Sequence, residues 1–358
     1  IGVKACFDVS YGAELTTKSY VEHLKNNNPK LMIAQPCPVL VSFIQIYRPE
    51  LIPYLAPAGS PMHHTMKWIK TFLPEYADAK IAVISPCYAK KREYDEIGLG
   101  DYNVTIKSLE KHFIENNIAL ASFEKVEYDN PPAERAVSYS TPGGLMRTAQ
   151  RFVPAIGDVT RKIEGHPQVF DYLAHLSNSI KKGDSPVFQL VDCLNCDRGC
   201  NGGPATSNRH KHLDEVEGFI ERRVERQKLL AGKKNKPVKD KDMNKSLEKH
   251  WSAELYKRSY ENHSSSFLSR FNKPTQEEIQ EMIKCYEGEI MLSENLKNAI
   301  NDQINAELWS AYLYLAMSLD AEAKGFKGVA NWFYVQWLEE HDHARIFMNY
   351  LNSVEAKV

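Results

Sequence analysis

Long apolar runs and an excess of one charge are both missing from this sequence. A helix that crosses a membrane needs about 20 mostly apolar residues, and no stretch of the 358 residues approaches that length. The 45 lysines and arginines balance 46 aspartates and glutamates, so no basic field attracts nucleic acid or an anionic membrane surface. The N-terminus also lacks the charged-then-apolar pattern of a secretion signal. We therefore expect a cytoplasmic globular protein that has neither nucleic acid nor a membrane among its partners.

Cysteine is scarce as well, with seven in the chain. This number is too small for a disulfide framework in so long a protein, which favours metal or redox chemistry for the cysteines. Three short apolar runs, residues 31–34, 81–84 and 187–191, are typical of buried strands, and each is followed by a cysteine. Helical patterns between them predict an α/β fold with mostly parallel sheets flanked by helices. Ligands gather beyond the carboxyl ends of such strands, where these cysteines would lie.

Four of the cysteines form a candidate metal-binding set. Cys37 and Cys87 each follow a proline at the end of a predicted strand, and Cys196 and Cys200 lie four residues apart in a glycine-rich loop. Four thiolates on loops can hold a 4Fe-4S cluster. A tetrahedral zinc site is the alternative, although zinc sites usually draw on two close pairs of ligands. The cysteines can also be small core residues. We take Cys193 to be a thiol that does not bind the metal, either spare or in contact with the ligand cysteines.

Six ordered segments resemble the catalytic domain of the iron-iron (FeFe) hydrogenases over residues 2–225. They are residues 11–16, 36–38, 60–61, 86–91, 143–146 and 196–203. The resemblance implies that the four cysteines bind a 4Fe-4S cluster and that Cys200 bridges it to a dinuclear iron subcluster with CO and CN ligands. It also implies two catalytic groups beside that subcluster: Lys90, which donates a hydrogen bond to a cyanide ligand, and Ser60 close by.

The sequence departs from the fast hydrogenases around this site. Pro36 replaces the cysteine that passes protons to the dinuclear iron, and Ser85, Leu194 and Met62 replace two methionines and a glutamine of the family pattern. Such replacements resemble the sensory and slow branches of the family. We therefore expect hydrogen sensing or slow hydrogen oxidation and proton reduction, with weak turnover and a redox or signalling protein as partner. The alternative is a non-catalytic iron–sulfur signalling module that keeps only the four-iron cluster.

Composition divides the chain into three parts. Residues 1–230 form the hydrogenase-like domain, and residues 231–290 are expected to be a lysine-rich linker followed by a polar helical region. In residues 291–358, apolar side chains recur at helical spacing in two stretches that Gly325 and Gly328 separate. Two antiparallel amphipathic helices make half of a four-helix bundle, which leaves an apolar face exposed. We therefore expect the protein to form a homo-oligomer through this C-terminal hairpin.

Three side chains of the hairpin form a second candidate metal site. Glu307 lies on the apolar stripe of the first helix, and Glu340 and His343 share one face of the second. Buried carboxylates need partners, and one Glu with a Glu-x-x-His pair is typical of di-iron bundles. A solvated surface pair is the alternative. Residues 291–358 resemble the first two helices of a bacterial-type ferritin, which implies a di-iron site when two hairpins pair and iron binding or ferroxidase activity as an alternative function.

Overall fold

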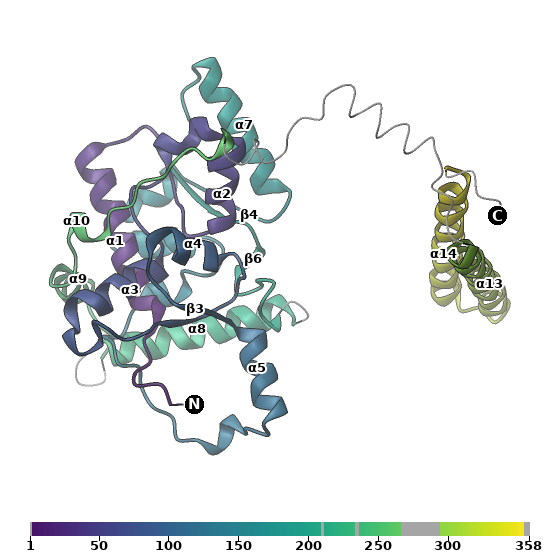
Figure 1. The fold of residues 1–358 in the computed structure, drawn as a ribbon, viewed down its shortest axis with the longest axis horizontal. Coiled ribbons are helices and arrows are strands. Elements are labelled where there is room, and N and C mark those ends of the chain that lie inside the picture. Colours follow the sequence, from purple (N-terminus) through teal and green to yellow (C-terminus); the bar gives the residue numbers. More distant parts are fainter. Residues whose placement is uncertain (1, 209–210, 233–235, 266–293, 354–358) are drawn as a thin grey trace. The chain divides into compact units, whose positions relative to one another are not determined.

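A computed structural model describes residues 2–208, 211–232, 236–265 and 294–353 (Figure 1). The chain divides into two units, Ile1–Arg270 and Phe271–Val358. The first unit contains short parallel strands among helices, and the described part of the second unit is a pair of long helices. Among the described residues, none of the helices combines the length and the apolar content that a membrane crossing requires.

The first unit contains two parallel sheets. Strand β5 (Leu190–Leu194) lies between β1 (Met32–Ile33) and β4 (Thr160–Glu164), and a second sheet pairs β2 (Ala82–Ser85) with β3 (Tyr102–Thr105). The first residues of β1, β5 and β4 are in register with one another. Because all of these pairings are parallel, the carboxyl ends of the strands in each sheet share one edge.

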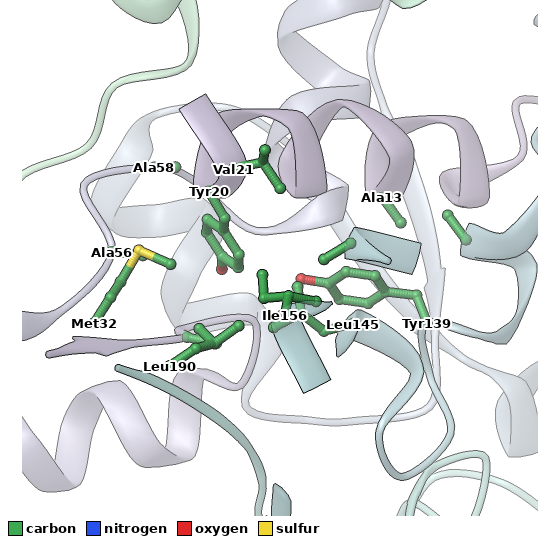
Figure 2. Close-up of a cluster of buried hydrophobic side chains, with 13 residues drawn as sticks. Ala13, Tyr20, Val21, Met32, Ala56, Ala58, Tyr139, Leu145, Ile156 and Leu190 are labelled. Carbon is green, nitrogen blue, oxygen red and sulfur yellow. The ribbon is translucent and has the colours of Figure 1, made fainter. Parts of the chain in front are cut away.

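One face of the larger sheet packs against helices α1 (Val9–Asn27) and α6 (Gly144–Ala149). Met32 of β1 and Leu190 of β5 belong to the buried cluster on this side, together with Tyr20 of α1. Figure 2 shows the ring of Tyr20 extending from its helix toward Met32 and Leu190. The apolar runs of the sequence therefore supply the residues that hold this helical layer on the sheet.

The opposite face of the same sheet packs against α2 (Pro38–Tyr47) and α7 (Gln168–Lys182). Ile33 and Val191 point to this side, because successive side chains of a strand face in opposite directions. Cys193 of β5 is also buried here. The sheet is thus covered by helices on both faces, which confirms the predicted α/β fold with parallel strands.

Local sequence signals explain where several helices begin. Side-chain oxygens of Asp8, Ser60 and Thr105 accept hydrogen bonds from the first turns of α1, α3 (Pro61–Phe72) and α5 (Ile106–Glu115). Further helices with defined bounds in the described part of the first unit are α4 (Lys90–Ile97), α8 (Leu213–Leu230), α9 (Asp240–Glu248) and α10 (Ala253–Tyr256). The 3-10 helices with defined bounds among the described residues are η1 (Pro49–Tyr54), η2 (Pro74–Tyr76), η3 (Leu120–Ser122), η4 (Arg135–Ser138) and η5 (Pro154–Val159).

Residues 236–265, which were expected in the linker and polar region, belong to the first unit and pack onto its helices. Met243 and Leu247 of α9 and Tyr256 of α10 are buried in one cluster with residues of α1 and α3. The Tyr256 ring also stacks on His64 with a centroid separation of 4.3 Å. A few apolar side chains therefore anchor a segment whose composition is otherwise polar. Residues 233–235 and 266–290 of the expected linker region lie outside the described ranges.

Strand β5 begins three residues later than the apolar run that predicted it. Val187 is 89% exposed and precedes the strand, whereas every residue of Leu190–Leu194 is buried. Cys193 therefore lies inside the strand, and Cys196 is the cysteine at its carboxyl end. The apolar run predicted that a strand lies here, but the residue at which the strand starts could not be read from the run.

The second unit contains helices α13 (Glu294–Ala323) and α14 (Lys327–Ser353). The Ser318 hydroxyl donates to the carbonyl oxygen of Ala330 at 2.8 Å, close to the turn between the helices. Farther from the turn, Glu307 lies beside His343. Ser318 contacts Ala330, and Glu307, earlier in the chain, contacts His343, later in the chain. This order of contacts requires the two helices to be antiparallel. The predicted helical hairpin is therefore confirmed.

Candidate functional site

A cavity of about 490 Å³ lies in the first unit, and its wall contains all four cysteines of the predicted set. Cys37 follows β1 and directly precedes α2, and Cys87 follows β2. Cys196 follows β5, and Cys200 is the last residue of β6 (Asp197–Cys200). The carboxyl ends of β1, β2 and β5, from both sheets, together with the separate strand β6, therefore bring the four thiols to one place.

Glycines allow the loop that carries the last two cysteines to approach the Cys87 loop. Gly199 has a φ of +62°, a conformation that favours glycine. A Cβ added to Gly203 would lie 2.5 Å from the carbonyl oxygen of Pro86. The amide of Ala205 donates to that same oxygen at 3.1 Å. The backbones of the two loops are therefore in contact, and a side chain at position 203 would push them apart.

Burial favours the protonated form of three cavity thiols, those of Cys37, Cys196 and Cys200. It raises the pKa of Cys200 to about 12, and the nearby Cys37 adds to the rise. Burial likewise raises the pKa of Cys37 and of Cys196. Metal binding must displace these protons, and metal cations would relieve the mutual repulsion of the thiolates. The donor set fits zinc or an iron–sulfur cluster, but a cavity of about 490 Å³ is far larger than one tetrahedral ion requires.

Lys90, the first residue of α4, reaches the same cavity and is held by two oxygens. Its Nζ donates to the carbonyl oxygen of Pro36 at 2.7 Å and to Oε2 of Glu93 at 2.9 Å. The side chain is nearly buried and forms part of the cavity wall. An ammonium group has three donors, so a third remains for a group inside the cavity. The structure brings Lys90 to the cysteines, and its hydrogen bond to a cyanide ligand stays a prediction.

Ser60 lies beside the cavity wall, which includes Pro61 and Met62 but not Ser60 itself. Its hydroxyl accepts a hydrogen bond from the amide of His63 at 3.3 Å and caps α3. Its own amide donates to Oε1 of Glu93, also at 3.3 Å. The contacts of this buried serine are those of a helix cap, and the catalytic role expected for it stays a prediction.

The residues that depart from the hydrogenase pattern surround the site. Pro36, Met62 and Leu194 all line the cavity. Ser85 is buried at the end of β2, and its hydroxyl donates to the carbonyl oxygen of Cys87 at 2.8 Å. Three of the departures thus give the cavity apolar walls, and the fourth fixes the backbone of a cysteine loop.

Two charged residues that the sequence analysis did not single out hold Lys90 in place. Glu93 pairs with Lys90 on the same helix, and Arg258 donates to Glu93 Oε1 at 3.0 Å. The i,i+3 spacing of Lys90 and Glu93 is a signal that the sequence offered. Arg258 gave no such signal, because it lies 165 residues from Glu93 in the chain.

The second predicted set, on the hairpin, also comes together. Glu307 of α13 and Glu340 and His343 of α14 each offer a ligand atom, and these atoms lie within 4.8 Å of one another. The Nδ1 atom of His343 is 3.0 Å from Glu340 Oε2 and 3.7 Å from Glu307 Oε2. A hydrogen bond from Gln303 lowers the pKa of Glu307, and the contact with Glu340 raises the pKa of His343. Carboxylate and imidazole ligands of this kind suit iron or zinc.

Comparison with known families matches two parts of the chain. Residues 1–204 match the family described as iron only hydrogenase large subunit, C-terminal domain, and residues 297–358 match the ferritin-like domain family. The second match falls on α13 and α14. The chain therefore joins a hydrogenase-like domain to ferritin-like helices, as the two resemblances predicted.

Solved FeFe hydrogenases share the fold of the first part. One, from a study of stepwise H-cluster assembly, has a TM-score of 0.54 and 18% identity. A variant of the enzyme from Chlamydomonas reinhardtii has a TM-score of 0.52 and 16% identity. Both alignments cover 73% of this chain and 85% of the other. At these identities the likeness shows the fold alone.

Bacterial non-heme ferritins are similar to the hairpin in sequence. The protein from Bacteroides fragilis is 51% identical over 61 residues, which are 17% of this chain and 38% of the ferritin. The protein from Staphylococcus aureus is 42% identical over 62 residues, again 17% of this chain and 37% of that ferritin. The chain spans little more than a third of the length of these relatives.

Proposed function

Since the chain belongs to the iron only hydrogenase large subunit, C-terminal domain family, we propose that its first unit binds a 4Fe-4S cluster through Cys37, Cys87, Cys196 and Cys200. The observation that supports this most directly is that cysteines from separate segments of the chain line one cavity. Cysteines that only fill a core have no reason to converge in this way. Cys193 illustrates the contrast, because it is buried in the core beneath the sheet.

The rest of the cavity would hold a dinuclear iron subcluster with CO and CN ligands, linked through Cys200. When bound, such a group supplies the iron at which hydrogen binds and splits. Lys90 has an ammonium donor left for an anionic ligand in the cavity, where a charge-assisted hydrogen bond is strong. Pro36 lines the cavity but carries no side-chain proton to pass on. The residues present therefore favour hydrogen sensing, or slow hydrogen oxidation and proton reduction, over fast turnover.

A redox or signalling protein is the partner that this function requires. The alternative is a signalling module that binds the four-iron cluster alone, and the apolar side chains of Met62 and Leu194 in the cavity wall favour it. Infrared spectra of the matured protein separate the two, since bound CO and CN absorb where protein does not. Iron–sulfur absorption without those bands would favour the signalling module.

Iron and sulfide content per chain after anaerobic reconstitution tests the proposal. We expect serine variants at positions 37, 87, 196 and 200 to lose most of the bound iron, because each removes a thiolate ligand. Cys6→Ser is the matched control, since Cys6 is exposed. If the unmodified protein takes up no iron, or if the four variants retain as much as Cys6→Ser does, the cluster proposal is wrong.

We propose iron binding by the hairpin as a second function, because the side chains of Glu307, Glu340 and His343 converge there. One hairpin supplies half of the ligands of a di-iron bundle, and a second copy would supply the others. The outer face of α13, which is opposite to Glu307 on the helix, favours a separate contact between copies of the chain, since Trp309 and Tyr312 are 68% and 70% exposed. Two large aromatic side chains three residues apart form one exposed apolar patch, and such patches are typical of protein–protein contacts.

Iron oxidation by the full chain tests this second function. We expect Glu340→Ala to lose most of the oxidation that the hairpin contributes, because it removes a carboxylate ligand. Glu339→Ala is the control, since its neighbouring carboxylate is exposed and bonds to Gln336 instead. Equal rates in the two variants would exclude the hairpin as the site of oxidation. The four cysteine variants should leave this activity unchanged.

A further inference from the structure

We infer that Arg258 is a positioning residue for Lys90 and acts through Glu93. The guanidinium of Arg258 donates to Oε1 of Glu93 at 3.0 Å and to Oε2 of Glu96 at 2.7 Å. The other oxygen of Glu93 accepts from Lys90 at 2.9 Å. Arg258 thereby holds the carboxylate so that its second oxygen faces the ammonium at the cysteine-lined cavity.

These charges are buried, so each depends strongly on its partners. The side chains of Glu93, Lys90 and Arg258 are 2%, 7% and 9% exposed. A buried carboxylate that loses one of two cationic partners must recover its hydrogen bonds elsewhere, by turning or by admitting water. Either response changes the position of the Lys90 ammonium, because Glu93 supplies one of its two acceptors. The planar guanidinium of Arg258 bonds to Glu93 and Glu96 in a fixed geometry, whereas the ammonium of a lysine is a rotatable point charge.

The backbone around Arg258 is tied to the segment that precedes α3. The Arg258 amide donates to the carbonyl oxygen of Pro57 at 3.3 Å, and the Tyr260 hydroxyl donates to that of Ala58 at 2.9 Å. This segment leads directly to Ser60, whose amide donates to the same Glu93 oxygen as Arg258. Two contacts from different parts of the chain thus converge on one carboxylate oxygen. Residues 253–260, which lie beyond the part of the chain that matches the hydrogenase family, therefore complete the surroundings of Lys90.

This inference rests on the proposed function only for what Lys90 does inside the cavity. The position of Lys90 can be tested in the full chain purified without iron, so a failure to bind iron would leave the test intact. The probe is reductive dimethylation by formaldehyde and cyanoborohydride, with the rate at each lysine followed by mass spectrometry of peptides. Lys67 is an internal reporter, since its Nζ donates to the carbonyl oxygen of Leu255 in the same segment. It reports whether the segment remains docked.

We expect Arg258→Gln to raise the dimethylation rate of Lys90 about tenfold, in line with the loss of a hydrogen bond to a charged group, and to leave the Lys67 rate unchanged. Arg92→Gln is the matched control, because Arg92 also pairs with Glu96 but is not bonded to Glu93. It should alter neither rate. Glu93→Gln should raise the Lys90 rate directly, and adding Arg258→Gln to it should have no further effect if Arg258 acts through Glu93.

Three results would overturn the inference. One is an unchanged Lys90 rate in Arg258→Gln, and another is an equal rise at Lys67, which would mean that the segment simply undocks. The third is a double variant in which the two effects multiply, since Arg258 would then act independently of Glu93. If Arg258→Gln does not yield folded protein, Arg258→Lys is measured instead by the same criteria, with a smaller rise expected at Lys90 alone.

Discussion

The ammonium of Lys90 donates a 2.7 Å hydrogen bond to the carbonyl oxygen of Pro36, the residue immediately before Cys37. This bond ties the start of α4 to the loop that carries the first cysteine of the cavity. It also places a positive charge beside thiols that must ionise to bind metal. Burial raises the pKa of Cys37 and of Cys200, and the charge of Lys90 opposes both rises.

Replacing Lys90 by methionine should weaken iron binding by about 10- to 100-fold, the usual cost of losing a residue that supports the metal ligands without binding the metal itself. Without the ammonium, the thiols lose the charge that favours their ionised form. Iron content at limiting iron, compared across a titration, measures the effect. Lys91→Met is the control, because Lys91 is exposed and pairs with Asp95 outside the cavity. Identical titrations for the two variants would contradict this role of Lys90.

Gly203→Ala should destabilise the first unit by about 1–3 kcal/mol, the usual cost of forcing extra atoms into a packed site. Its Cβ would lie 2.5 Å from the carbonyl oxygen of Pro86, so the cysteine loops must separate. Gly218→Ala is a matched substitution on helix α8. Its new Cβ would lie 3.5 Å from the nearest atom, Nη1 of Arg222, and alanine favours the helix. Urea unfolding of both variants measures the difference. A Gly203→Ala protein as stable as the wild type would show that the loops can move apart freely.

Two adjacent buried histidines should make the protein sensitive to acid. Burial lowers the pKa of His63 to about 4 and that of His64 to about 3, from an ordinary value of 6.5. Below pH 6.5 these two histidines bind protons in the unfolded chain but remain neutral in the folded protein. The stability linked to these side chains is therefore complete above pH 6.5 and is lost as the pH falls toward 4 for His63 and toward 3 for His64.

Urea midpoints of the iron-free protein between pH 7 and about pH 4 measure this loss. His64→Gln should reduce the slope of stability against pH, whatever its effect on stability at pH 7. His112→Gln, a change at an exposed histidine, should leave the slope as in the wild type. A slope that both variants share would assign the acid sensitivity to other groups.

The exposed face of α13 should determine the oligomeric state. Trp309→Glu places a charge among the exposed side chains of Tyr312 and Leu319, which lie on the same stripe of the helix. If a second copy covers this stripe, the charge must be buried without a partner, and dimerisation should weaken by at least about tenfold. Sedimentation of the full chain over a concentration series measures it. Trp309→Phe keeps the face apolar and should remain associated, and a wild-type chain that stays monomeric would exclude the pairing.

The position of the four cysteines could be predicted from local motifs. The contacts that hold Lys90 beside them could not. Each cysteine follows a short apolar run or lies in a glycine-rich loop, so its place at a strand end could be inferred from neighbouring residues. Ser60, which the resemblance implied to be a catalytic group, has the contacts of a helix cap, and its catalytic role stays a prediction. The contact between Arg258 and Glu93 depends on how distant segments pack, and no local pattern encodes that.

The backbone contact between Ala205 and Pro86 has a consequence for biosynthesis. The walls of the cavity come from segments that leave the ribosome far apart in time, and the enclosure cannot close before residue 205 has emerged. Arg258 arrives later still. A ligand that needs all four thiols together can therefore bind only after the hydrogenase-like part has been translated, because the cavity that gathers the cysteines is incomplete before then.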